Sequence, residues 1–138
     1  ALLATTNPSL NDPNDSKEYE TSVVAYLLFN PALKPKKDME VTFEKHIEAS
    51  MPPMIAFWGT KDKWLTGWKS ACEKMQSLEN ESIEWWTAQG QSHGFFKRKP
   101  WKDLTIIAAD KFLKKYGLIE GEVTLPAPEN GVKLIKTL

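Results

Sequence analysis

The sequence is poor in the residues that form cross-links and metal sites. It contains one cysteine, Cys72, and two histidines among its 138 residues. A single thiol excludes an internal disulfide, and no C-x-x-C motif or Cys/His cluster offers the spacing of metal ligands. We therefore expect no cofactor and no metal. The cellular compartment stays unknown, because one cysteine is compatible with an oxidising or a reducing environment.

An excess of one charge and a long apolar run are also missing. Eighteen Lys and Arg balance 18 Asp and Glu, so the formal net charge is zero. Nucleic acids and anionic membranes select a basic surface, so neither is expected as a partner. No apolar run approaches the ~18 to 20 residues of a membrane span. The composition, 41% hydrophobic and 26% charged, is that of a soluble globular chain long enough for one domain.

The chain does contain alternating strand and helix patterns. Apolar runs predict strands at 22–30, 51–59 and 82–88, and apolar spacing predicts helices at 39–49, 64–78 and 101–116. The helix at 64–78 has the clearest pattern, and Cys72 on its apolar face predicts a buried, inert thiol. Strands that alternate with helices indicate the α/β class, with a mostly parallel sheet of about three strands flanked by helices.

Two loops follow the second and third predicted strands, where parallel sheets collect catalytic groups. The aspartate loop (residues 59–64) reads GTKDKW and presents Asp62, and the histidine loop (residues 88–96) contains GQSHGFF and presents His93. Neighbouring strands lie about 4.8 Å apart, so a carboxylate could contact one imidazole nitrogen. Such a contact fixes the tautomer and leaves the other nitrogen to accept a hydroxyl proton. Asp62 as a turn former or helix N-cap, and His93 as an ordinary loop histidine, are the alternatives.

Ser92 lies in a literal G-x-S-x-G motif, Gly90 to Gly94. A nucleophile elbow turns directly from a strand into a helix. Here FFKRKP intervenes, and Pro100 is expected to open the helix. Adjacent side chains in extended backbone also point to opposite sides, so His93 is badly placed to serve its neighbour. We therefore reject Ser92 as the nucleophile.

The segments PPMIAFWGTKDKW, GQSHGFF and KFLKKYGLIEGE resemble the C-terminal half of α/β-hydrolase esterases, in the acetyl-esterase and lipase-like branch. The resemblance covers roughly residues 1 to 122 and leaves 123–138 as a tail, which we expect to wrap the surface. It implies that Asp62 is the triad acid and His93 the triad base. It also implies that ALLATTNP closes the helix after a nucleophile elbow, so that the elbow serine and the oxyanion-hole loop lie before residue 1.

The resemblance implies carboxylic ester hydrolysis by a Ser-His-Asp mechanism, with this chain supplying the acid and the base. The expected substrate is a small-molecule or carbohydrate-linked ester. The expected partner is an N-terminal hydrolase half or, through an exposed sheet edge, a second copy of the chain. The isolated chain should then be inactive. The alternative is a non-catalytic, truncated α/β-hydrolase module that acts in binding or self-assembly.

Overall fold

A four-stranded sheet forms the centre of the molecule. The computed structural model describes residues 2–16, 18–19, 22–33, 43–129 and 131–138. The strands, in spatial order, are β1 (Tyr26–Phe29), β2 (Met54–Gly59), β3 (Ile83–Ala88) and β4 (Ile135–Lys136). β1, β2 and β3 are parallel, and β4 runs antiparallel to β3. The predicted α/β class with a mostly parallel sheet is confirmed, and the sheet has one strand more than expected.

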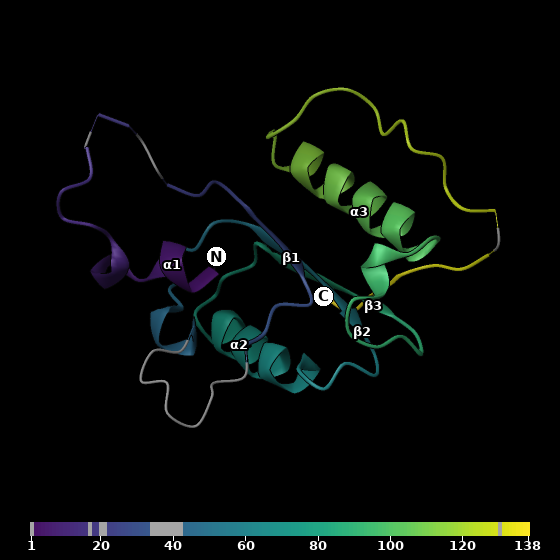
Figure 1. Ribbon diagram of the computed structural model, residues 1–138, viewed down its shortest axis with the longest axis horizontal. Coiled ribbons are helices and arrows are strands. Elements are labelled where there is room, and N and C mark those ends of the chain that lie inside the picture. Colours follow the sequence, from purple (N-terminus) through teal and green to yellow (C-terminus); the bar gives the residue numbers. More distant parts are fainter. Residues whose placement is uncertain (1, 17, 20–21, 34–42, 130) are drawn as a thin grey trace.

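Helices cover both faces of this sheet. They are α1 (Leu2–Thr6), α2 (Leu65–Ser77) and α3 (Trp101–Lys115), with short 3-10 turns η1 (Pro8–Leu10), η2 (Phe43–His46) and η3 (Phe95–Lys97). Figure 1 shows α1 and α2 on one side of the strands and α3 on the other. α2 and α3 therefore match the helices predicted at 64–78 and 101–116. Within the described residues, no helix is long and apolar enough to cross a membrane.

The helix predicted at 39–49 is not found in the part that can be compared. Residues 39–42 lie outside the described residues, and the rest of the segment forms only the 3-10 turn η2. Phe43 and Ile47 are both buried in the core beside α2. The two side chains therefore fix a short turn against the core. Their four-residue spacing is also that of one helical face, which is why the sequence predicts a helix here.

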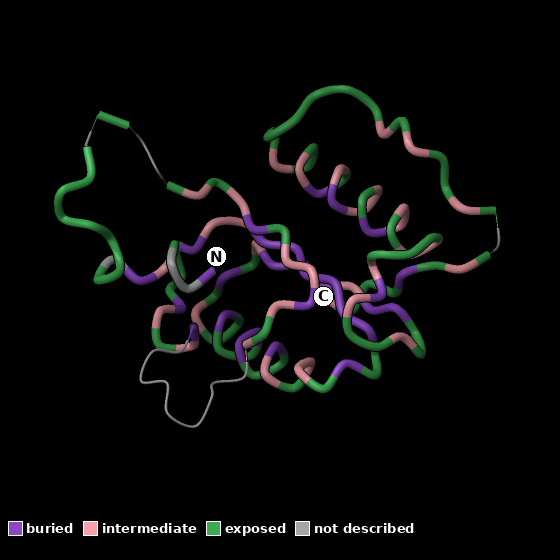
Figure 2. Tube along the Cα trace, in the orientation of Figure 1, coloured by how far each residue is buried: buried purple, intermediate pink, exposed green. Residues whose placement is uncertain are grey.

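Two apolar layers hold the sheet between the helices. All six residues of β2 are buried, and successive side chains enter opposite layers. Trp58 packs with α2, its ring centroid 6.2 Å from that of Trp68. Phe57 enters the opposite layer with α3, and the adjacent Trp85 and Trp86 divide between the layers in the same way. Figure 2 shows burial concentrated in the central strands, with exposed backbone in the long loops.

The end of the chain departs from the expectation of a surface tail. Residues 135–136 form β4, and Thr137 and Leu138 exchange backbone hydrogen bonds with Trp85. Leu134 is buried in the α3 layer, whereas Leu138 packs against the α2 layer. β4 thus covers the edge of β3, which would otherwise expose unpaired backbone groups. A two-residue strand is too short for a sequence pattern to reveal, and the domain boundary at residue 122 stays a prediction.

Glu84 connects the central sheet to α3 and β4. Its carboxylate lies 2.7 Å from Lys115 Nζ and 3.1 Å from Lys136 Nζ, and the residue is buried. Burial alone would raise the pKa of Glu84. Together, the hydrogen bonds and positive charges of the two lysines outweigh that effect and hold the pKa of Glu84 below its ordinary value. The ionised form is therefore favoured by the fold.

Replacing Glu84 with Gln should make part of the stability independent of pH. Since the folded pKa is lowered, the ion pairs stabilise the protein above the unfolded pKa and lose their effect as pH falls through the folded pKa. We expect Glu84→Gln to cost about 1 kcal/mol at pH 7, since both lysines are partly exposed. Urea unfolding at several pH values checks this. The exposed pair Lys114 and Glu122 supplies the control: Glu122→Gln should leave the unfolding curve unchanged.

Candidate active site

The carboxyl ends of β2 and β3 place the two predicted loops side by side. The strands pair in register up to Gly59 opposite Ala88, so the aspartate loop and the histidine loop leave the sheet at the same level. Backbone hydrogen bonds then join the loops, from Thr60 N–H to Ala88 O (3.1 Å) and from Lys61 N–H to Gln91 O (2.8 Å). The Thr60 hydroxyl accepts a further bond from the backbone of the histidine loop. The loops are thus fixed to one another.

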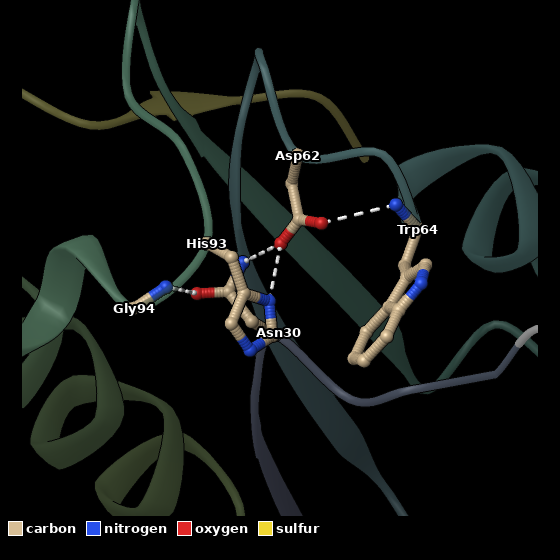
Figure 3. Close-up of polar contacts among 5 residues, drawn as sticks. All are labelled: Asn30, Asp62, Trp64, His93 and Gly94. Atoms are coloured by element: carbon tan, nitrogen blue, oxygen red, sulfur yellow. Dashed lines mark hydrogen bonds and ion pairs between the residues drawn. The ribbon is translucent and has the colours of Figure 1, made fainter.

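Asp62 and His93 are in direct contact at this edge. His93 Nδ1 lies 2.9 Å from Asp62 Oδ2, and Figure 3 shows Nε2 on the far side of the ring, pointing away from the carboxylate. The Asp62 side chain is fully buried, whereas 53% of the His93 side chain is exposed. The structure therefore brings together the two residues that the sequence predicts as a pair. Their catalytic roles remain a prediction.

Asp62 also forms a turn, as the alternative interpretation expected. Its second oxygen, Oδ1, accepts a hydrogen bond of 3.0 Å from the backbone N–H of Trp64, immediately before α2. The two oxygens of one carboxylate thus do different things. Oδ1 organises the entry to the helix and Oδ2 faces the imidazole, so the turn fixes the direction in which the acid points.

Asn30 is a third polar residue at the site, and the sequence analysis missed it. It follows β1, is buried, and donates a hydrogen bond of 2.8 Å from Nδ2 to Asp62 Oδ2. Its Oδ1 accepts from the backbone N–H of Gly94 at 3.3 Å. The available signal was the Asn-Pro step directly after the first strand, at the same edge as the two loops. In the predicted strand at 22–30, Asn30 is only the last residue.

Trp64 packs against the imidazole. The ring centroids of Trp64 and His93 are 5.0 Å apart and their planes meet at 73°, an edge-to-face arrangement. Lys63 Nζ lies 5.5 Å from the centre of the indole. The His93 ring is therefore held by a hydrogen bond to Asp62 and by an aromatic contact with Trp64 (Figure 3).

Ser92 is exposed and does not occupy a strand-to-helix elbow. The histidine loop passes through the turn η3 before α3 begins at Trp101. Among the described residues, Asn30 and Glu79 are the non-glycine positions with positive φ, so the backbone at Ser92 lacks that form of strain. The glycines on either side, Gly90 and Gly94, take the left-handed conformations instead.

Other reactive groups lie apart from this edge. Cys72 is buried in the layer under α2, where burial, with a smaller effect of Glu73, raises the pKa of its thiol to about 12. An inert thiol is what its place in the helix pattern predicts. No cluster of three His, Cys, Asp or Glu side chains suited to a metal occurs in the part of the chain that the structure describes.

The fold is that of a partial α/β-hydrolase, and comparison with solved structures relates it to an esterase. Esterase 2 from the planctomycete Thermogutta terrifontis, with propionate bound, superposes with a TM-score of 0.74 at 25% identity, over 88% of this chain and 53% of that one. The same enzyme phosphorylated by paraoxon gives 0.75 at 28% identity, over 88% and 51%. No protein-family profile and no curated protein sequence matches the chain.

The predicted resemblance to the C-terminal portion of an esterase is therefore confirmed at the level of the fold. The chain spans about half the length of the esterase chains that it matches. The superposition describes the fold over 88% of this chain and assigns no role to Asp62 or His93.

Gly59→Ala tests whether close approach of the loops holds the site together. A Cβ at Gly59 would lie 2.3 Å from the backbone oxygen of Gln91, so the loops would have to separate. We expect a loss of about 3 kcal/mol in urea unfolding, with loss of the hydrogen-bonded Nδ1 proton of His93 in NMR spectra. Gly90→Ala is the control. Gly90 has φ +73° and open space, so its substitution should cost about 1 to 2 kcal/mol and preserve that proton.

Asp62→Asn should change the tautomer of His93. A carboxylate accepts a hydrogen bond and so favours the Nδ1–H form, whereas an amide can also present a donor. Nitrogen-15 shifts of the imidazole distinguish the two forms. We expect Nδ1–H in the wild type and a shift towards Nε2–H in the variant, with the signals of His46 unchanged as an internal reference. An unaltered His93 spectrum would contradict the pairing.

Proposed function

We propose that the chain supplies the acid and the base of a serine carboxylesterase, as Asp62 and His93, while the serine comes from outside these 138 residues. The observation that carries the proposal is the 2.9 Å contact from His93 Nδ1 to Asp62 Oδ2 at the carboxyl ends of the strands. A buried acid beside a half-exposed histidine matches the division of labour in a triad, in which the acid orients and the base meets the substrate. The esterase fold supports the same assignment.

The proposed chemistry uses the two imidazole nitrogens separately. Asp62 holds the proton on Nδ1, so Nε2 carries the lone pair and accepts the proton of the serine hydroxyl as the hydroxyl attacks the ester carbonyl. Asp62 stabilises the imidazolium that results. His93 then donates the proton from Nε2 to the departing alcohol, and repeats the cycle with water to release the acid. The donors that stabilise the tetrahedral oxyanion would also come from outside the chain.

We propose esters of short carboxylic acids as the substrate class, small molecules or acyl groups on a carbohydrate. The support comes from the superposed esterase, whose structures include propionate-bound and butyrate-bound forms. The indole of Trp64 beside His93 offers an apolar surface next to the reacting position. The acetyl-esterase branch suggested by the sequence is part of this proposal.

The proposed partner is a hydrolase segment that carries the serine and pairs with the outer edge of β1. β1 is an outer strand of the described sheet; Leu27 within it is 37% exposed, and Val24, just before it, is 65% exposed. An unpaired parallel strand with exposed apolar side chains is a site for strand addition. Self-association through this edge is the competing outcome, and it corresponds to a non-catalytic assembly module.

A chimaera tests the assignment. The chain replaces the matching part of the Thermogutta terrifontis esterase, and hydrolysis of p-nitrophenyl propionate is measured. We expect Asp62→Asn and His93→Ala to lower kcat by about 10³ to 10⁴-fold, because the base is lost or held in the wrong tautomer. Ser92→Ala is the matched control, and it should change kcat by less than about threefold because the residue lies outside the proton path.

Paraoxon labelling gives a second measurement that does not need turnover. Mass spectrometry should show a phosphoryl adduct on the elbow serine of the chimaera and none on the isolated chain. An adduct on Ser92 of the isolated chain would sink the assignment of the serine to another segment. A folded chimaera without activity, combined with a dimeric isolated chain in light scattering, would favour the assembly module.

A further inference from the structure

We propose that Asn30 is a positioning residue that holds Asp62, and through it His93, in the reactive arrangement. This inference rests on the proposed function. It assigns a role to a residue that has neither the charge nor the nucleophilicity of a triad member. The starting point is its place in the fold: Asn30 directly follows β1, so each of three adjacent strands leads to one polar residue at the same edge of the sheet (Figure 3).

The backbone of Asn30 is adapted to this position. Its N–H continues the sheet ladder by donating to Phe57 O at 3.1 Å, and its φ is +50°. Positive φ is unfavourable for most side chains, and Asn is among the few that tolerate it. The left-handed residue turns the chain at the strand end, before Pro31, and directs the amide towards the neighbouring loops. Asn30 is only 3% exposed, so the amide must find its partners inside the protein.

The amide forms one bond to each neighbouring loop. Nδ2 donates to Asp62 Oδ2 (2.8 Å) and Oδ1 accepts from Gly94 N–H (3.3 Å). Oδ2 therefore receives two donors, Asn30 Nδ2 and His93 Nδ1, while Oδ1 receives the N–H of Trp64. Three donors in three directions fix the carboxylate plane. Without Asn30, the Asp62 carboxylate could rotate about its last side-chain torsion. The hydrogen bond between Oδ2 and His93 Nδ1 would then be less well aligned.

The chemistry of the site requires both halves of this amide. An Asp at position 30 would keep the acceptor for Gly94 but would place a second negative charge beside Asp62. An aliphatic residue would leave the partly buried Gly94 N–H and one direction of Oδ2 without these partners. Asn combines a donor, an acceptor and tolerance of positive φ. The contacts with Asp62 and with the histidine loop therefore favour Asn at position 30 as strongly as the turn does.

The test uses the isolated chain and the tautomer of His93. Asn30→Gly removes the amide and retains freedom at positive φ. We expect the ratio of Nδ1–H to Nε2–H forms of His93 to fall by about fivefold, the equivalent of one net hydrogen bond. Asn30→Asp, at pH 8, should also displace the His93 signals from their wild-type positions. In the active chimaera, Asn30→Gly should lower kcat by about 10- to 100-fold and leave KM nearly unchanged.

Asn80 provides a matched control. It is another buried Asn that makes one donor and one acceptor contact, with Met51 O and Ser82 N–H, in the opposite part of the sheet. Asn80→Ala should lower the melting temperature without moving the His93 resonances. A structural role for Asn30 would likewise change stability alone.

The outcomes separate this inference from the proposed function. If Asp62→Asn shifts the His93 tautomer and folded Asn30→Gly and Asn30→Asp do not, the positioning role is wrong and the acid and base assignment stands. Loss of the fold in both Asn30 variants also overturns the positioning role, because Asn30 would then hold the sheet. If the Asn30 variants move the tautomer but the chimaera never hydrolyses esters, the positioning role stands and the proposed function fails.

Discussion

The in-register pairing of three parallel strands is the constraint on which the site depends. Phe29 pairs with Phe57, and Gly59 pairs with Ala88, so β1, β2 and β3 reach one edge of the sheet together. A slip of one residue in either ladder would exchange the two faces of a strand, so that each side chain would enter the opposite layer, where it does not fit. Because β2 is buried on both faces, such a slip is very costly. The register that the core enforces is therefore also the register that aligns the polar loops.

The aspartate and histidine loops approach closely at Gly59, and this lets Asp62 and His93 come into contact. The backbone of the histidine loop lies where a side chain at Gly59 would be, and hydrogen bonds between the loops maintain that separation. Asp62 then lies three residues beyond the strand, and its own turn directs one oxygen to the imidazole. Core packing fixes the register of the strands, and Gly59 allows the short distance between the loops. The turn at Asp62 fixes the direction of its carboxylate.

Much of this arrangement could be predicted from the sequence, and the exceptions have physical reasons. Buried apolar runs and helical spacing identified β2, β3, α2 and α3, because these elements are long enough for a periodic pattern. Asp62 and His93 could be paired because both follow buried strands. β4 was not predicted because a two-residue strand shows no periodic pattern and pairs with Trp86 and Thr87, about 50 residues earlier in the chain. Asn30 was not predicted as a site residue, because an Asn before a proline is common in ordinary turns.

The electrostatics of Asp62 explain why the site needs several elements at once. The carboxylate is wholly buried, and an ionised group in such a place is unfavourable unless donors replace its water. No Lys or Arg pairs with it in the described part of the chain; the donors are Asn30, the Trp64 backbone and His93. The first two are neutral groups on two further elements, the end of β1 and the entry to α2. His93 is the third partner, and 53% of its side chain is exposed, so the site joins a buried carboxylate to the protein surface through one ring.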